Sequence, residues 1–181
     1  MRLFVALDIP AAVRSKLSAY SDRVREYAPN AKWARVEGLH VTLKFIGEVK
    51  EEKLVPIKAA LARVKAGELE VGFEGIGFFP TAKSPRVFWA GVKAGDELPQ
   101  LAKAVDDDLA AIGFAPEDRA YSPHLTLARS RNGELRSLTP LLEAEAPPQF
   151  GTMTAREFFL YQSKPGRGGS TYTKLQAFRL G

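Results

Sequence analysis

Apolar and polar positions along the chain divide it into short strands and amphipathic helices. A buried strand is predicted over Leu3–Leu7, and strands that alternate between two faces are predicted over Leu39–Ile46 and His124–Ala128. Further strands are predicted over residues 69–79, 86–92, 157–162 and 172–180. Apolar residues three or four positions apart predict helices over residues 10–27, 54–64 and 96–113, and a weaker one over 135–142. Asp96 is expected to cap the third helix and Gly113 to end it.

The order of these elements repeats. Phe4 lies 36 residues before His40, and Phe88 lies 36 residues before His124, with one amphipathic helix in each interval. A strand, a helix and a histidine strand, found twice, predict an internal duplication with an approximate two-fold axis. We therefore expect residues 1–181 to form a single domain of two pseudo-symmetric lobes that share one active-site cleft.

Strict alternation also predicts which side chains share a face of the first histidine strand. His40, Thr42 and Lys44 fall on one face. Val41 and Phe45 fall on the other, which we expect to be buried. His40 and Thr42 should therefore point away from the core.

Composition places the chain among ordinary soluble globular proteins. Its 181 residues are 45% hydrophobic and 26% charged. Because cysteine is absent, disulfides, thiolate metal sites and a cysteine nucleophile are excluded, and the composition suits a reducing cytoplasm. The apolar run before Asp8 is too short for a signal peptide or a membrane span. We expect a cytoplasmic protein that does not enter a membrane.

The net charge of +5 favours an anionic partner but does not identify one. A basic surplus attracts polyanions such as RNA without sequence preference. The same surplus is common in basic proteins that have no polyanionic partner.

The only two histidines occur in matching settings, His40-Val-Thr42-Leu and His124-Leu-Thr126-Leu. Residues i and i+2 of a strand lie about 6.6 Å apart on one face, so an imidazole and a hydroxyl at this spacing can reach the same phosphate. Two such strands facing each other would surround one phosphorus atom with two histidines and two threonines. The pattern indicates phosphoryl chemistry without a metal.

In-line displacement at phosphorus needs a base on the entering oxygen and an acid on the departing one. Histidine fits both roles because its ordinary pKa is about 6.5. The hydroxyls of Thr42 and Thr126 would donate to the non-bridging oxygens. Spacing does not say which of His40 and His124 is the acid.

Other interpretations fit the histidines less well. A lone histidine is more often a hydrogen-bonded core residue, but this does not explain the repetition. A zinc site lacks recognisable ligands, because there is no cysteine and no His-Glu-x-x-His helix. A Ser-His-Asp arrangement would not require the motif twice. The Gly166–Gly169 run could bind phosphate through its amides, but it is more often a hairpin loop.

Four segments, RLFVALDIP, LHVTLKFIGEV, YSPHLTLAR and FFLYQS, resemble the bacterial and archaeal 2′-5′ RNA ligase family. This family belongs to the two-histidine phosphoesterase superfamily and is read as RNA 2′,3′-cyclic phosphodiesterases. The likeness spans nearly the whole chain. It implies a bilobal α+β fold with antiparallel sheets lining a central cleft and helices on the outside.

The resemblance also implies a reaction, namely opening of a terminal 2′,3′-cyclic phosphate to a 2′-phosphate with neither metal nor other cofactor. His40 would be the proton donor to the leaving 3′ oxygen and His124 the proton acceptor that activates water. Thr42 and Thr126 would bind the phosphate. The implied partner is RNA with 2′,3′-cyclic phosphate or 5′-hydroxyl ends, such as cleaved tRNA, bound by a monomer. In reverse, with an RNA 5′-hydroxyl in place of water, the site would form a 2′-5′ linkage without ATP.

Several secondary candidates accompany the motifs. Lys44 could neutralise substrate charge if it shares the His40 face. Arg129 follows the second motif, but strict alternation puts it on the opposite face unless the strand ends or bulges there. Tyr121, Phe45 and Trp33 could stack a terminal base, although aromatic residues near strands are more often core.

Two other classes of function stay open. A module could hold a nucleotide or an RNA end in the same cleft without turnover, although binding alone does not need two titrating groups. A general RNA-binding protein would act through charge and show a steep salt dependence.

Overall fold

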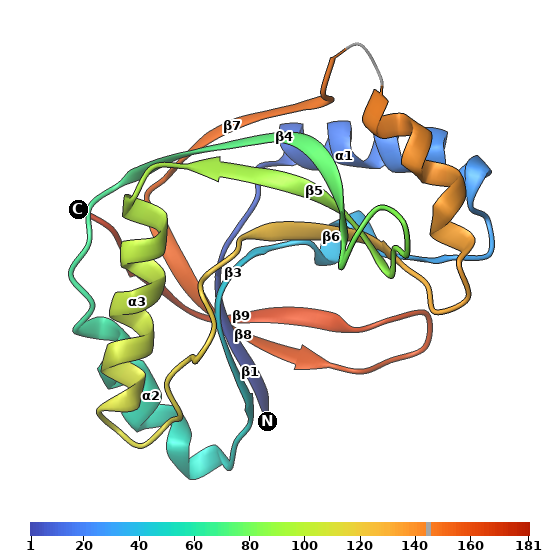
Figure 1. Ribbon diagram of the computed structural model, residues 1–181. Helices are drawn as coiled ribbons and strands as arrows, with labels where there is room; N and C mark the ends of the chain where they lie inside the picture. The colour runs from blue at the N-terminus through green and yellow to red at the C-terminus, as the bar shows by residue number, and fades with distance from the viewer. Residues whose placement is uncertain (144–145) are drawn as a thin grey trace.

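The computed structural model describes residues 1–143 and 146–181, and its strands form two antiparallel sheets (Figure 1). The strands are β1 (Arg2–Leu7), β2 (Lys32–Trp33), β3 (Val41–Glu48), β4 (Leu69–Phe79), β5 (Val87–Ala94), β6 (His124–Arg129), β7 (Gln149–Ala155), β8 (Glu157–Lys164) and β9 (Thr171–Arg179). The first sheet has the order β3-β1-β8-β9, and the second has the order β2-β6-β5-β4-β7. The strands β2 and β7 were not predicted.

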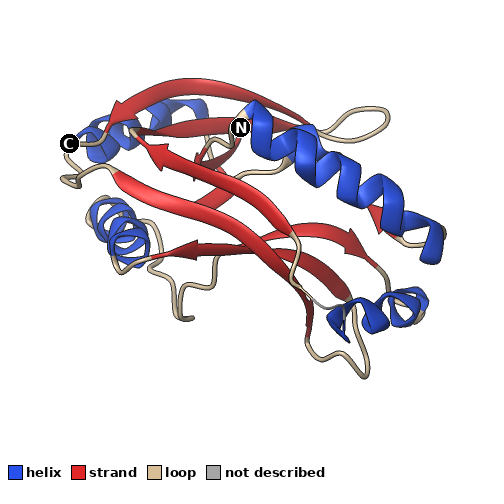
Figure 2. Cartoon of the chain, turned by 90° about the horizontal axis from the view of Figure 1, so that it is seen from above, coloured by secondary structure: helices blue, strands red, loops and turns tan. Residues whose placement is uncertain are grey.

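The helices lie on the periphery of the sheets, as Figure 2 shows. They are α1 (Ala11–Val24), α2 (Leu54–Ala62) and α3 (Glu97–Ala110), with 3-10 helices η1 (Arg25–Tyr27), η2 (Val36–Gly38), η3 (Glu51–Lys53) and η4 (Glu134–Glu143). This arrangement confirms the predicted α+β class with antiparallel sheets and outer helices. In the described ranges, no helix is both long and apolar enough to cross a membrane.

Two details of the helix predictions, the positions of Tyr27 and Asp96, are wrong. Tyr27 lies beyond α1 and is 59% exposed, so the apolar stripe ends one turn earlier than expected. Asp96 adopts helical backbone angles and makes no side-chain capping bond. The weak helix forms as the 3-10 helix η4, which contains Pro140, a residue that lacks the N–H needed inside an α-helix.

Each half of the chain repeats one pairing. In the first half, β1 and β3 are antiparallel neighbours separated in sequence by α1, and in the second half β5 and β6 are antiparallel neighbours separated by α3. The predicted duplication is therefore present in the topology.

The predicted alignment of the two halves is wrong by one residue. Thr42 pairs with Ala6 and Thr126 pairs with Trp89, so Ala6 and Trp89 occupy equivalent positions. The equivalent of Phe4 is then Val87, not Phe88. Because side chains alternate across a strand, a shift of one residue exchanges the faces. Phe88 accordingly lies fully buried in the core, whereas Phe4 lies on the face that carries Thr42.

The long helices exchange sheets. α1 follows β1 of the first sheet but packs on β7 of the second, where the rings of Tyr20 and Phe150 meet edge-on at 5.4 Å. α3 follows β5 of the second sheet but packs on β3 of the first. In Figure 1, α1 lies beyond the second sheet while α2 and α3 lie beside the first. Each long helix thus covers the sheet of the other half, so the halves interlock around a continuous apolar core.

An extra residue interrupts the alternation of β3. The pairing steps from Ala6 with Thr42 to Val5 with Lys44, so that Leu43 forms a β-bulge. The bulge exchanges the faces of the residues that follow. Lys44 turns into the core side of the sheet and is only 5% exposed, whereas Phe45 joins the face of Thr42 and is 70% exposed.

The expectations for Lys44 and Phe45 are therefore both wrong. Lys44 does not share the face of His40 and cannot neutralise a substrate there. Its ammonium donates to Asp106 Oδ1 at 2.6 Å and to the Ala115 carbonyl at 2.8 Å, and it lies 3.3 Å from Glu117 Oε1. Burial lowers the pKa of Lys44, but the hydrogen bonds to Asp106 and Glu117 outweigh it and leave the pKa raised. This cluster joins β3 to α3 and to the segment before β6.

We expect Lys44→Ala to lower the free energy of unfolding by about 3 kcal/mol, because it leaves the Asp106 carboxylate beside a cavity without its cation. Lys103 lies on α3, the helix that carries Asp106. Lys103→Ala removes an exposed ion pair with Asp107 and should change the free energy of unfolding by less than about 0.5 kcal/mol. Urea denaturation followed by circular dichroism measures both. Equal stability of the two variants would contradict a structural role for the Lys44 cluster.

Candidate active site

The two histidine motifs lie at the starts of β3 and β6, which belong to different sheets. The Tyr121 hydroxyl, three residues before His124, donates to the Thr42 carbonyl at 2.7 Å. On the other side, the Ala34 N–H donates to the Leu127 carbonyl at 2.9 Å, and η2 then leads directly into the first motif. Both β3 and β6 appear in the middle of the view in Figure 1. The fold therefore brings together residues that are 79 positions apart in the sequence.

Both imidazoles are held in the same way. His40 Nδ1 lies 3.0 Å from the Gly38 carbonyl, and His124 Nδ1 lies 2.9 Å from the Ser122 carbonyl, each two residues earlier in the chain. A carbonyl oxygen only accepts, so Nδ1 carries the hydrogen in both contacts. This leaves Nε2 of each ring as the nitrogen that can take up or release a proton.

His40 is surrounded by aromatic rings. Its ring centroid lies 4.5 Å from that of Tyr161, 5.4 Å from that of Tyr172 and 5.7 Å from that of Phe4. All three belong to strands of the first sheet. These rings fix the orientation of the imidazole and remove water from one side of it.

Burial and nearby charge keep His40 neutral. Burial and, to a smaller extent, the Arg14 guanidinium together lower its pKa to about 4, against the opposing effect of Asp8. Arg14 and Lys174 both bind the Asp8 carboxylate, at 2.9 and 2.6 Å. At neutral pH the imidazole of the free protein is therefore uncharged.

His124 has one aromatic neighbour on its own sheet. The ring of Phe79 meets it edge-on at 4.9 Å, and Trp89 packs on Phe79 at 5.4 Å. The Trp89 indole lies across Gly77, where a Cβ atom would collide with the ring. Gly77 thus makes room for the aromatic support beneath the second motif.

The threonines of the motifs face the same way as their histidines. Thr42 and Thr126 are half-buried, and in the part of the chain described here no protein group binds either hydroxyl. Both hydroxyls can therefore donate to a bound anion.

A second bulge brings Arg129 to the site. Thr126 pairs with Trp89 and Ala128 pairs with Phe88, so Leu127 is the extra residue. Arg129 then shares the face of Thr126 and is exposed, which meets the condition under which the sequence allowed it a role.

Of the three aromatic residues considered for base stacking, only Phe45 exposes its ring. The hydroxyl of Tyr121 is tied to β3, and burial raises its pKa. Trp33 donates its Nε1–H to the Ala28 carbonyl at 2.8 Å and packs edge-on against Phe88. The Gly166–Gly169 run forms the hairpin loop between β8 and β9, as its composition favoured.

The aromatic rings and the Asp8–Arg14 pair around His40 were not identified from the sequence. Contacts between different strands cannot be predicted from the periodicity of a single segment. The segments that carried the family resemblance do contain Phe4, Asp8 and Tyr161, and this was the available signal. Across residues 1–143 and 146–181, no group of three or more potential ligands is placed to hold a metal ion.

The family model described as LigT like phosphoesterase matches the chain in two segments, residues 7–89 and 92–172, one in each half. The chain belongs to the LigT-like phosphoesterase family. This match confirms the resemblance, and the two segments agree with the duplication in the fold.

Curated relatives of the chain are named RNA 2′,3′-cyclic phosphodiesterase. The protein of Archaeoglobus fulgidus is 38% identical over 180 residues, covering 98% of this chain and 99% of the relative. That of Methanothermobacter thermautotrophicus is 32% identical and covers 99% of both chains. Among solved structures, E. coli LigT complexed with 3′-AMP superposes with a TM-score of 0.80 at 29% identity, covering 99% of this chain and 97% of that one.

We expect NMR titration of the free protein to give a pKa for His40 well below that of an unfolded histidine, near 4. Above pH 6.5 the neutral ring is favoured in both states; as the pH falls toward 4, the unfolded state binds the proton first. Stability should therefore drop by about 2 kcal/mol between pH 7 and pH 5. His40→Gln should lack this part of the drop. With two histidines in the chain, the His124→Gln variant assigns the signals. A midpoint at or above 6.5 would contradict the burial argument.

Proposed function

We propose that this protein is an RNA 2′,3′-cyclic phosphodiesterase that opens a terminal cyclic phosphate to a 2′-phosphate. The observation that carries the proposal is the matched pair of histidines at the starts of β3 and β6, each with Nδ1 bound to a carbonyl two residues earlier, while Tyr121 joins the two motif segments. The two relatives reported above carry this activity in their names. Such a pair supplies the base and the acid that in-line displacement requires.

His124 acts as the proton acceptor that activates water, and His40 acts as the proton donor to the leaving 3′ oxygen. Water attacks phosphorus, the bond to the 3′ oxygen breaks, and the proton from His40 completes the 3′-hydroxyl. The low pKa of free His40 is compatible with this role because an adjacent phosphate anion favours the imidazolium. Substrate binding thus charges the acid.

Thr42 and Thr126 bind the non-bridging oxygens through their hydroxyls, and the exposed guanidinium of Arg129 adds positive charge on the same face. E. coli LigT has been crystallised with phosphate and with 3′-AMP, ligands that share the phosphate group of the proposed substrate. In reverse, an RNA 5′-hydroxyl replaces water and a 2′-5′ linkage forms.

We infer that residues 1–181 act as a single domain of two lobes with one shared site. The exchange of α1 and α3 between the sheets supports this, because separation of the lobes would expose both. RNA ending in a 2′,3′-cyclic phosphate or a 5′-hydroxyl is the proposed partner. The monomeric state and the cytoplasmic location stay predictions.

The central test supplies a short RNA with a 2′,3′-cyclic end in excess EDTA. We expect a 2′-phosphate product, identified by mass and by the position of its phosphate. His40→Ala and His124→Ala should each lower kcat by about 10³-fold, within the range of general acid–base catalysis. Thermal melts of both variants check folding. Tight binding without product across a wide pH range would favour a non-catalytic binding module instead.

Thr42→Val and Thr126→Val should each lower kcat/KM by about 10²-fold, because each removes a donor to the transition state while keeping the shape of the side chain. Thr152→Val, an exposed threonine of β7, is the matched control and should leave kcat/KM unchanged. Steady-state kinetics with one cyclic substrate measures all three. A decrease in kcat/KM for only one of the two threonine variants would contradict equivalent roles of Thr42 and Thr126.

A further inference from the structure

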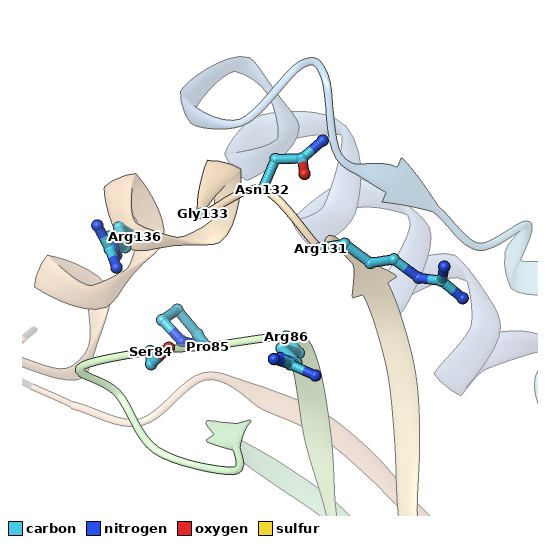
Figure 3. Close-up of a pocket in the computed structure, with 7 residues that line it drawn as sticks. All are labelled: Ser84, Pro85, Arg86, Arg131, Asn132, Gly133 and Arg136. Atoms are coloured by element: carbon cyan, nitrogen blue, oxygen red, sulfur yellow. The ribbon is translucent and has the colours of Figure 1, made fainter.

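A basic pocket lies at the far end of the second motif strand (Figure 3). It encloses about 300 Å³ and contains Arg86, Arg131 and Arg136, with Ser84 and Asn132 beside them. These side chains come from the β4–β5 loop, the segment after β6 and η4. The Ser130 N–H donates to the Arg86 carbonyl at 3.0 Å and holds the first two segments together.

The positive charge of this pocket is not neutralised within the described residues. None of Arg86, Arg131 and Arg136 forms an ion pair there, across 1–143 and 146–181. The carboxylate of Glu134 accepts from the Ser130 hydroxyl and from the Asn132 N–H of the pocket at 3.2 Å, so its one negative charge leaves the three arginines with a positive surplus. Arg86, Arg131 and Arg136 all line the cavity, although Arg131 and Arg136 point in different directions in Figure 3, and a guanidinium fork matches the geometry of phosphate oxygens.

The pocket continues the line of the second motif. β6 runs from His124 to Arg129, about 16 Å at the rise of a strand, and Arg131 follows two residues later. Arg129 is exposed on the face of Thr126, between the histidine and the pocket. A mononucleotide bound at His124 is too short to cover this distance, whereas an oligonucleotide can.

We propose that the arginine pocket binds a backbone phosphate of the RNA segment that lies 5′ to the cyclic end. This inference rests on the proposed function and extends it from the reacting nucleotide to the RNA chain. RNA fits better than an acidic peptide because the cationic line begins at a phosphate-binding motif and because guanidinium forks recognise phosphodiesters in any sequence. The pocket would make the enzyme prefer oligonucleotides to cyclic mononucleotides.

The test compares Arg131→Ala/Arg136→Ala with a control of equal charge, Arg63→Ala/Arg179→Ala, whose side chains are exposed at the end of α2 and on β9. Substrates are cytidine 2′,3′-cyclic phosphate and a hexaribonucleotide with the same cyclic end. We expect the pocket variant to raise KM for the hexanucleotide about tenfold with kcat retained, and to change kcat/KM for the mononucleotide less than twofold. The control should match the wild type. The salt dependence of binding should become shallower by about 0.7 per lost phosphate contact.

Equal losses on both substrates, or an unchanged KM for the hexanucleotide, would overturn the proposal. So would competition by an acidic hexapeptide as strong as that by RNA. Arg131→Lys/Arg136→Lys keeps the charge and removes the forks, so an intermediate KM supports phosphate recognition even where the alanine variant folds poorly. If the wild type lacks activity, the proposed function fails by itself. Fluorescence anisotropy with a 3′-hydroxyl hexanucleotide then tests phosphate binding by the pocket separately. The proposal requires that the pocket variant bind this RNA more weakly than the control variant does.

Discussion

The arrangement of the site depends on one extra residue in each motif strand. Leu43 in β3 and Leu127 in β6 form equivalent bulges directly after the threonines. Each bulge reverses the alternation of the residues that follow, so Phe45 and Arg129 join the face of the motifs. The same step sends Lys44 into the core side of the first sheet. Two matched backbone irregularities thus decide which side chains share the face of the motif threonines.

The buried position of Lys44 gives the first bulge a second consequence. Its ammonium reaches Asp106 on α3 and Glu117 in the segment that leads to β6. Because α3 belongs to the second half of the chain, this cluster holds one half against the other. Because α1 and α3 each pack on the sheet of the other half, their apolar contacts also hold the two halves together. Both histidines therefore stand on strands whose relative position is fixed by the core.

The site is symmetric in its backbone and asymmetric in its surroundings. Both rings donate Nδ1–H to a carbonyl two residues back, which leaves the same nitrogen free on each. His40, however, lies among three aromatic rings beside the Asp8–Arg14 pair, whereas His124 has Phe79 as its aromatic neighbour. A duplicated scaffold thus gives its two imidazoles different surroundings by changing what packs around each ring.

The sequence by itself determined the local features. The repeated His-x-Thr motif, the strand around each copy and the helix before it can be read from spacing and periodicity, because these depend on neighbours within a few residues. Only the tertiary structure decided on which face of its sheet each of Lys44, Phe45 and Arg129 lies, since a bulge arises from pairing with another strand. It also decided which rings surround His40 and which arginines line the pocket beyond β6, because these contacts join segments distant in the chain. Short-range patterns carry no information on such contacts.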